Sequence, residues 1–122
     1  MDGIIIVNKP SGITSHDVVN RVRRKFNMRR VGHAGTLDPL ATGVLVILLG
    51  KSTQLFDKFV VFDKAYAATL RLGTQTTSAD ITGEVIEQRP FDHVTEGQFK
   101  DVLQQLVGES EQMPPMVSAV KF

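Results

Sequence analysis

A single carboxylate lies in a segment that is rich in loop-forming residues. Residues 32–45 read GHAGTLDPLATGVL, and Asp38 lies six positions before the apolar run 44–49. A carboxylate in a glycine-rich loop can serve as a nucleophile, a general base or an electrostatic stabiliser. The alternative is structural, because aspartate caps helix N-termini and proline fits a first helical turn, so Asp38 would cap a short helix starting at Pro39. The pattern alone allows both interpretations.

Other kinds of catalytic site find less support in the sequence. There is no cysteine, which excludes disulfides, thiolate metal sites and cysteine nucleophiles. The glycines of the 32–45 segment are not followed by the Gly-Lys-Ser/Thr of a P-loop, which disfavours nucleotide hydrolysis. A hydrolase of small molecules built from Ser15, His33 and Asp38 stays open as an alternative, although a nucleophile-elbow pattern is missing. The histidines lie far apart, without the paired spacing of a zinc site: His16, His33 and His93.

Basic residues concentrate in the first part of the chain. Residues 1–51 hold 8 Lys/Arg against 3 Asp/Glu, and residues 52–122 hold 6 against 10, although the net charge of the whole chain is only +1. Such a concentration attracts a polyanion, and a solvated helix face is the alternative that the charges leave equally open. Six of the basic residues fall within ten positions: Arg21, Arg23, Arg24, Lys25, Arg29 and Arg30.

Elements that would position Asp38 are predicted from the first part of the sequence. Residues 4–7 are a short β-branched run that ends in the NKPSG turn, which indicates a strand. Thr14 and Asp17 form a capping-box pattern that predicts the start of a helix. The apolar residues of this helix recur at helical spacing: Val18, Val19, Val22 and Phe26. The continuous apolar run 44–49 is typical of a strand covered on both faces.

The second part of the sequence contains two predicted strands and a helix. Residues 64–73, KAYAATLRLG, alternate as a strand should, with Tyr66 on the more apolar side. Residues 74–83 are rich in turn formers and predict a loop, which leads into a strand at 84–87. The clearest helix covers residues 95–107, with a capping-box pattern at its start and a glycine just beyond its end.

These elements predict an α+β domain in which helices cover a largely antiparallel mixed sheet, with the active site in the loop between Val31 and Val44. Prolines favour an extended segment over residues 113–122. No segment approaches the ~18 apolar residues that a membrane span needs, and the N-terminus lacks the pattern of a secretory signal, so we expect a cytoplasmic protein.

Tyr66 would be either a core aromatic or a platform on which a base stacks.

The motifs taken together resemble one family. VNKPSGITSHDVV, GHAGTLDPLATGVL, KAYAATLRLG, TQTTSADITG and PPMVSAVK follow one another from about Ile4 to Lys121 in the order found in the catalytic domain of TruB-type tRNA pseudouridine synthases. The resemblance implies a pseudouridine synthase-like fold and the isomerisation of uridine 55 in the T-loop of tRNA to pseudouridine. It further implies that tRNA, through its T-loop and stem, is the partner, and that no cofactor, metal, membrane or obligate protein partner takes part.

The resemblance also implies roles for single residues. Asp38 falls on the catalytic aspartate, which either attacks the sugar or removes a proton from it, and Tyr66 falls on the tyrosine that packs against the flipped uracil. His33 falls on a histidine that helps to hold the base out, Asp80 on an aspartate that helps to position an arginine, and Lys9 on a lysine near the catalytic pocket. Basic residues of the cluster would contact the tRNA backbone: Arg21, Arg24, Lys25, Arg29 and Arg30.

Two departures from the family pattern affect this interpretation. Val117 stands where many relatives have a tyrosine. The family's catalytic domain also continues past Phe122 and supplies an arginine that pairs with the catalytic aspartate, whereas this sequence has no arginine after Arg89. We therefore predict that residues 1–122 are the N-terminal portion of a pseudouridine synthase catalytic domain, without its remainder and its C-terminal RNA-binding domain, and inactive alone. The alternative is a noncatalytic RNA-binding fragment.

Overall fold

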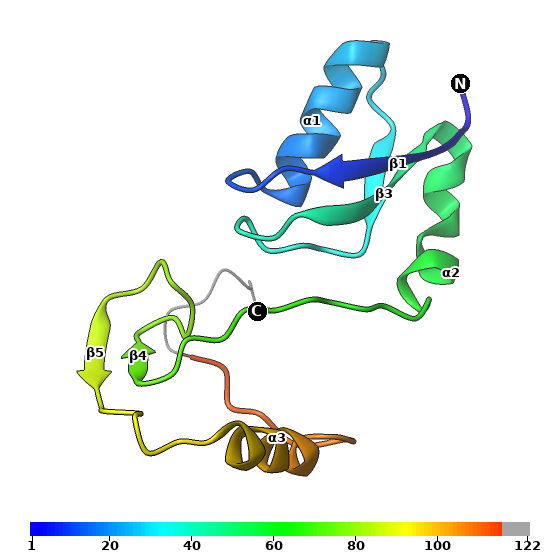
Figure 1. The fold of residues 1–122 in the computed structure, drawn as a ribbon. Coiled ribbons are helices and arrows are strands. Elements are labelled where there is room, and N and C mark those ends of the chain that lie inside the picture. Colours follow the sequence, from blue (N-terminus) through cyan, green and yellow to red (C-terminus); the bar gives the residue numbers. More distant parts are fainter. Residues whose placement is uncertain (116–122) are drawn as a thin grey trace. The chain divides into compact units, whose positions relative to one another are not determined.

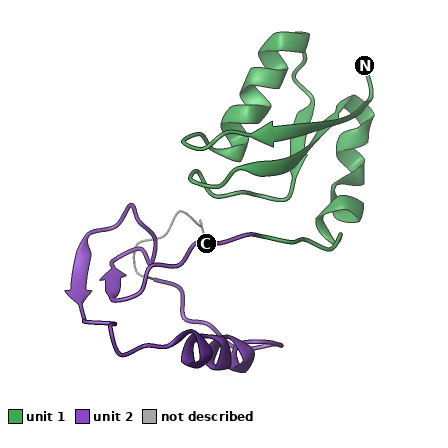
Figure 2. Ribbon diagram, viewed as in Figure 1, with its two compact units in different colours: residues 1–66 green, residues 67–122 purple. Residues whose placement is uncertain are grey.

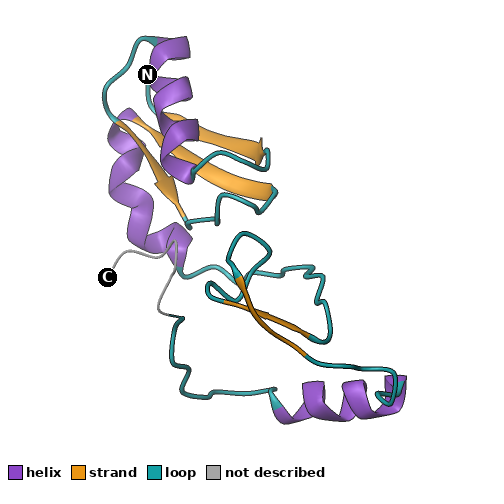
Figure 3. Cartoon of the chain, turned by 90° about the vertical axis from the view of Figure 1, so that its left-hand side faces the viewer, coloured by secondary structure: helices purple, strands orange, loops and turns teal. Residues whose placement is uncertain are grey.

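The computed structural model describes residues 1–115, so Val117 and most of the extended segment predicted for residues 113–122 lie outside the described residues. The chain divides into two compact units, Met1–Tyr66 and Ala67–Phe122 (Figure 2). Antiparallel strands and helices occur in both units (Figure 3), which confirms the predicted α+β class. Within the described residues, no helix is long and apolar enough to cross a membrane.

The first unit is built on a three-stranded antiparallel sheet. Its strands are β1 (Gly3–Lys9), β2 (Val31–Ala34) and β3 (Gly43–Leu49), in the order β1-β3-β2. Helix α1 (Ser15–Phe26) packs against one face of this sheet (Figure 1). The strands predicted at 4–7 and 44–49 are thus confirmed, and the central strand β3 carries the chain away from the segment that contains Asp38.

Helix α1 begins as the sequence predicts. The Thr14 hydroxyl accepts a hydrogen bond from the Asp17 backbone N–H at 2.9 Å, and the Asp17 carboxylate accepts one from the Thr14 backbone N–H at 2.9 Å. These hydrogen bonds to Thr14 hold the pKa of the Asp17 carboxyl below its usual value. The helix ends at Asn27, whose φ of 50° is left-handed, a conformation that asparagine tolerates. The capping box fixes the position of Ser15, the first helical residue.

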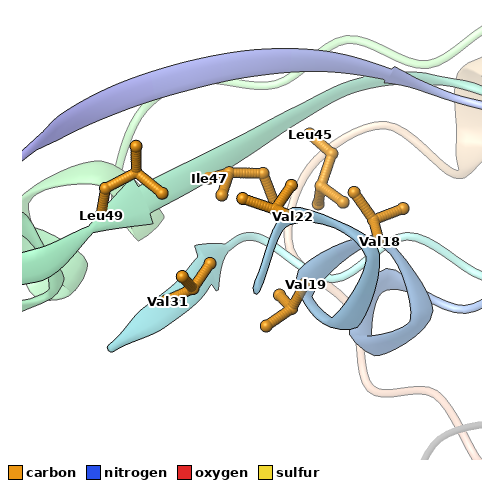
Figure 4. Close-up of a cluster of buried hydrophobic side chains, with 7 residues drawn as sticks. All are labelled: Val18, Val19, Val22, Val31, Leu45, Ile47 and Leu49. Carbon is orange, nitrogen blue, oxygen red and sulfur yellow. The ribbon is translucent and has the colours of Figure 1, made fainter. Parts of the chain in front are cut away.

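The hydrophobic core lies between α1 and the sheet. Side chains from the helix point toward side chains from β2 and β3 (Figure 4). The two faces of β3 are both buried only near the end of the strand, at Ile47, Leu48 and Leu49, whereas Val44 at its start is 71% exposed. The predicted coverage of both faces is therefore confirmed for the second half of β3. The core cluster consists of Val18, Val19, Val22, Val31, Leu45, Ile47 and Leu49.

One feature of the first unit differs from the prediction, and another lies where the sequence made none. The sequence predicts a loop from residue 31 onward, but residues 31–34 form β2, which pairs with β3. Four residues that include a glycine and a histidine show no periodicity, so only the neighbouring strand identifies them. After β3, the chain forms a 3-10 helix, η1 (Gly50–Leu55), and a short helix, α2 (Phe56–Val60).

The second unit contains a two-stranded antiparallel sheet of β4 (Thr74–Thr76) and β5 (Val85–Gln88), followed by α3 (Glu96–Gln105). The strand predicted at 84–87 is confirmed within one residue. The loop predicted at 74–83 is wrong at its start, because β4 occupies it. Helix α3 has the predicted capping box, but its apolar residues are not buried by the described residues of the unit.

The strand predicted for residues 64–73 is wrong. This segment has no regular strand in the structure. Alternation of apolar and polar residues produces a strand only where a neighbouring strand satisfies the backbone N–H and C=O groups, and no described strand pairs with this segment.

Candidate active site

Asp38 lies in the connection between β2 and β3. The Ala41 backbone N–H donates to the Asp38 carbonyl oxygen at 3.0 Å, which closes a turn with Pro39 at its second position. The interpretation of Asp38 as a helix cap is therefore wrong, because the chain turns here without forming a helix. The Asp38 side chain is exposed, and within residues 1–115 its carboxylate accepts no hydrogen bond. Both carboxylate oxygens are open to a ligand.

A buried serine holds the residue before Asp38. Ser15, which is 3% exposed, accepts a hydrogen bond from the Leu37 backbone N–H at 3.0 Å and donates one to the Leu37 carbonyl oxygen at 3.2 Å. The Leu37 side chain packs against the hydrophobic core. Ser15 and Asp38 therefore do not form the hydroxyl–carboxylate pair of a serine hydrolase, because the serine hydroxyl is buried and already engaged with backbone groups.

A buried lysine holds the residue after Asp38. Lys9 is 0% exposed, and its ammonium group donates to the carbonyl oxygens of Pro10 at 2.8 Å, Ile13 at 2.7 Å and Pro39 at 3.1 Å. The Gly12 backbone N–H donates to the same Pro39 carbonyl at 2.7 Å. All three ammonium protons have acceptors, so in this structure Lys9 joins the NKPSG turn to the Asp38 turn and has no proton left for a ligand.

His33 lies on β2 opposite Ile47, at the edge of a pocket of about 610 Å³ in the first unit. The pocket is lined by α1, β2, α2 and the residues that follow them, and its charged or titratable lining residues are all basic: His16, Arg23, His33 and Lys64. Burial lowers the pKa of His33 below its usual value, the Gly35 backbone opposes this, and the nearby His16 adds to the lowering. The His33 Nδ1 atom is buried without a hydrogen-bond partner within residues 1–115.

Tyr66 is the last residue of the first unit and is 69% exposed. The interpretation of this tyrosine as a core aromatic is therefore wrong. An exposed ring can stack on a base, which keeps the second interpretation as a prediction.

Asp80 lies in the second unit, in the loop between β4 and β5. Its carboxylate accepts hydrogen bonds from the Ser78 hydroxyl at 2.6 Å, from the Thr82 backbone N–H at 2.8 Å and from the Thr82 hydroxyl. These hydrogen bonds lower the pKa of Asp80. The contacts described for this carboxylate organise its own loop, and its predicted role in positioning an arginine stays a prediction.

Two members of the basic cluster make hydrogen bonds within the first unit. The Arg23 guanidinium is partly buried and donates to the Val31 carbonyl oxygen at 3.2 Å and to the Asn20 side chain at 3.3 Å, which ties α1 to β2. The Arg30 guanidinium donates to the Thr53 hydroxyl at 3.0 Å. The exposed side chains of the cluster, which are available to a polyanion, are Arg21, Arg24, Lys25, Arg29 and Arg30.

Comparison with known proteins assigns the chain to a family. Residues 23–122 match the profile described as TruB family pseudouridylate synthase (N terminal domain). The chain belongs to the TruB family of pseudouridylate synthases.

Curated relatives of this TruB chain carry the name tRNA pseudouridine synthase B. The protein from Thermobifida fusca (strain YX) is 55% identical over 120 residues, which is 98% of this chain and 41% of the relative. The protein from Opitutus terrae is 46% identical over 121 residues, covering 99% of this chain and 50% of the relative. The chain therefore spans about two fifths to one half of the length of these relatives.

A solved structure also resembles part of the chain. It is the structure of an H/ACA RNP bound to a substrate RNA containing 2'-deoxyuridine, in which one chain is 43% identical with a TM-score of 0.45, over 46% of this chain and 18% of that one.

The sequence singles out Asp38 as a candidate but does not predict the residues that hold its turn. Ser15 entered only as a hydrolase nucleophile, and Gly12 and Leu37 had no role. Their hydrogen bonds link segments that are 22 or more positions apart in the chain, which no local pattern reports.

Proposed function

We propose that this TruB protein converts uridine 55 in the T-loop of tRNA to pseudouridine in the cytoplasm, with Asp38 as the catalytic carboxylate. The observation that carries the proposal is the exposed Asp38 side chain on a turn whose two neighbouring residues are hydrogen-bonded to the buried side chains of Lys9 and Ser15. The relatives named tRNA pseudouridine synthase B support tRNA as the substrate.

The reaction exchanges one bond of the nucleotide for another. The bond between ribose C1' and uracil N1 breaks, the base turns, and C5 bonds to the sugar; N1 gains a proton and C5 loses one. The Asp38 carboxylate would attack the sugar or remove a proton from it, and both routes need an ionised carboxylate close to the ribose. The turn at Pro39 presents the carboxylate on the surface, where an extruded nucleotide can approach it.

The other predicted residues would act on the extruded nucleotide and on the RNA backbone. Extrusion costs a few kcal/mol, which contacts to the flipped base must offset. Tyr66 would stack on the uracil, and His33 would occupy the space that the base leaves in the T-loop. Basic side chains would contact phosphates and orient the tRNA without reading its sequence: Arg21, Arg24, Lys25, Arg29 and Arg30.

Replacement of the carboxylate tests this function. In the protein expressed from its complete gene, Asp38→Asn is expected to lower tritium release from 5-tritiated uridine tRNA by at least about 100-fold, because an amide cannot act as a base or a nucleophile. Affinity for tRNA should change little, because the phosphate contacts stay intact. The exposed Asp63 offers a matched control, and Asp63→Asn should leave both quantities unchanged.

Two outcomes of this experiment would contradict the proposal. Undiminished turnover in Asp38→Asn would remove Asp38 from the reaction. A parent protein that binds tRNA but releases no tritium would favour a noncatalytic RNA-binding protein.

Residues 1–122 alone are expected to release no tritium in the same assay, because the family's arginine partner of the catalytic aspartate is not among them.

A further inference from the structure

We propose that Ser15 is a positioning residue for Asp38, in that its buried hydroxyl fixes the backbone from which the carboxylate projects. This inference rests on the proposed function, because it concerns the residue that would carry out the reaction. Ser15 would touch neither the ribose nor the base.

The geometry of the Ser15 hydroxyl supports this role. A hydroxyl can donate one hydrogen bond and accept two, and the Ser15 hydroxyl both donates to Leu37 and accepts from it. It accepts the Leu37 backbone N–H at 3.0 Å and donates to the Leu37 carbonyl oxygen at 3.2 Å. One side chain thus makes the pair of hydrogen bonds that an antiparallel neighbour strand would otherwise make, at a point where β2 has ended and β3 has not yet begun.

The carbonyl group that Ser15 holds belongs to the peptide unit that joins Leu37 to Asp38. Fixing this peptide plane restricts the direction in which the Asp38 side chain leaves the backbone. On the other side, the Pro39 carbonyl is held by Gly12 and Lys9. Loss of the two hydrogen bonds between Ser15 and Leu37 would leave the Asp38 turn held only at Pro39.

The position of Ser15 makes it a firm attachment point. It is the first residue of α1, directly after the N-cap Thr14 and inside the capping box, and the helix is packed into the core through Val18 and Val19. The hydroxyl is therefore held by rigid secondary structure, whereas the Asp38 turn has no regular structure of its own. A catalytic group that is displaced by about 1 Å can lose roughly 100-fold in rate.

The test compares Ser15→Ala and Ser15→Cys with the parent protein expressed from its complete gene. Ser15→Ala removes both hydrogen bonds, and Ser15→Cys fills the buried space with a weakly hydrogen-bonding thiol, which provides a second variant if alanine prevents folding. Single-turnover tritium release from 5-tritiated uridine tRNA, with enzyme in excess, is measured together with tRNA affinity. Ser52→Ala is the matched control, because this partly buried serine lies in η1 and its hydroxyl makes no hydrogen bond within residues 1–115.

The expected result is a single-turnover rate constant about 10- to 100-fold lower in Ser15→Ala, a smaller loss in Ser15→Cys, and unchanged tRNA affinity. A role in folding alone would lower the fraction of active enzyme, measured separately by titration with tRNA, and would leave the rate constant at saturating enzyme unchanged. A normal rate constant in either folded Ser15 variant would overturn the inference.

The same experiment separates this inference from the proposed function. If Asp38→Asn abolishes turnover while Ser15→Ala reacts at the normal rate, Asp38 is catalytic and only the role of Ser15 is wrong. If Asp38→Asn reacts normally, Asp38 is not catalytic and the proposed function fails at its central residue. Ser15 then has no catalytic carboxylate to position.

Discussion

The buried Lys9 ammonium provides the sharpest test of how the Asp38 turn is stabilised. Lys9→Met keeps a long, flexible side chain in the same space and removes the ammonium group, which now donates to the carbonyl oxygens of Pro10, Ile13 and Pro39. The Pro39 carbonyl retains the Gly12 N–H at 2.7 Å.

The magnitude follows from the two carbonyl groups that lose their partner. The carbonyl oxygens of Pro10 and Ile13 accept no other hydrogen bond among residues 1–115. Pro10 is exposed and Ile13 is half-buried, so water can partly replace the lost donor, and each hydrogen bond is worth about 0.5–1.5 kcal/mol; the two together predict a loss of about 1–3 kcal/mol in the free energy of unfolding. At about 2–4 °C per kcal/mol for a chain as long as the relatives, the melting temperature should fall by roughly 2–12 °C.

Thermal unfolding of the protein expressed from its complete gene, followed by circular dichroism, measures this loss. Lys51→Met serves as the control, because Lys51 is exposed and its side chain makes no hydrogen bond within the described residues. The control should melt within about 2 °C of the parent protein, as surface substitutions usually do. If Lys9→Met melts at the same temperature as the control, the three hydrogen bonds of the ammonium group contribute little to the free energy of unfolding. That result would refute the conclusion that Lys9 stabilises the Asp38 turn.

Two further predictions concern the charges near the site. Because burial lowers the pKa of His33 in the folded state, the unfolded state binds more protons just below pH 6.5, so the free energy of unfolding should rise with pH through this range, and urea unfolding of His33→Asn should show a shallower rise. In tRNA binding, Arg21→Ala and Arg24→Ala should each reduce the slope of log affinity against log salt by about 1, whereas Arg23→Ala should mainly lower the melting temperature, because Arg23 bonds to Val31. A slope near zero in the parent protein would favour a small neutral substrate instead.

Several parts of the structure could be predicted because their cause is local. The capping box of Thr14 and Asp17 and the apolar spacing that follows predict α1, since the groups that interact lie within one or two helical turns. The continuous apolar run 44–49 predicts β3, because such a run is typical of a strand that is covered on both faces. The choice of Asp38 also came from the sequence, through its loop-forming neighbours and the family motif.

Other parts depend on contacts between distant segments. The same alternation that predicts a strand around Tyr66 fails where no described strand pairs with it, and β2 forms without any periodicity because β3 pairs with it. A single sequence records the propensity of a segment but not the partner that would satisfy its backbone.

Taken alone, the sequence predicted the helix, the central strand and the family, and it singled out Asp38 as the candidate carboxylate. How that carboxylate is held is visible only in the folded chain, because Ser15 meets Leu37 across 22 positions and Lys9 meets Pro39 across 30. A buried hydroxyl or ammonium must find backbone acceptors inside the fold, and which acceptors it finds is settled by packing and not by its neighbours in the chain.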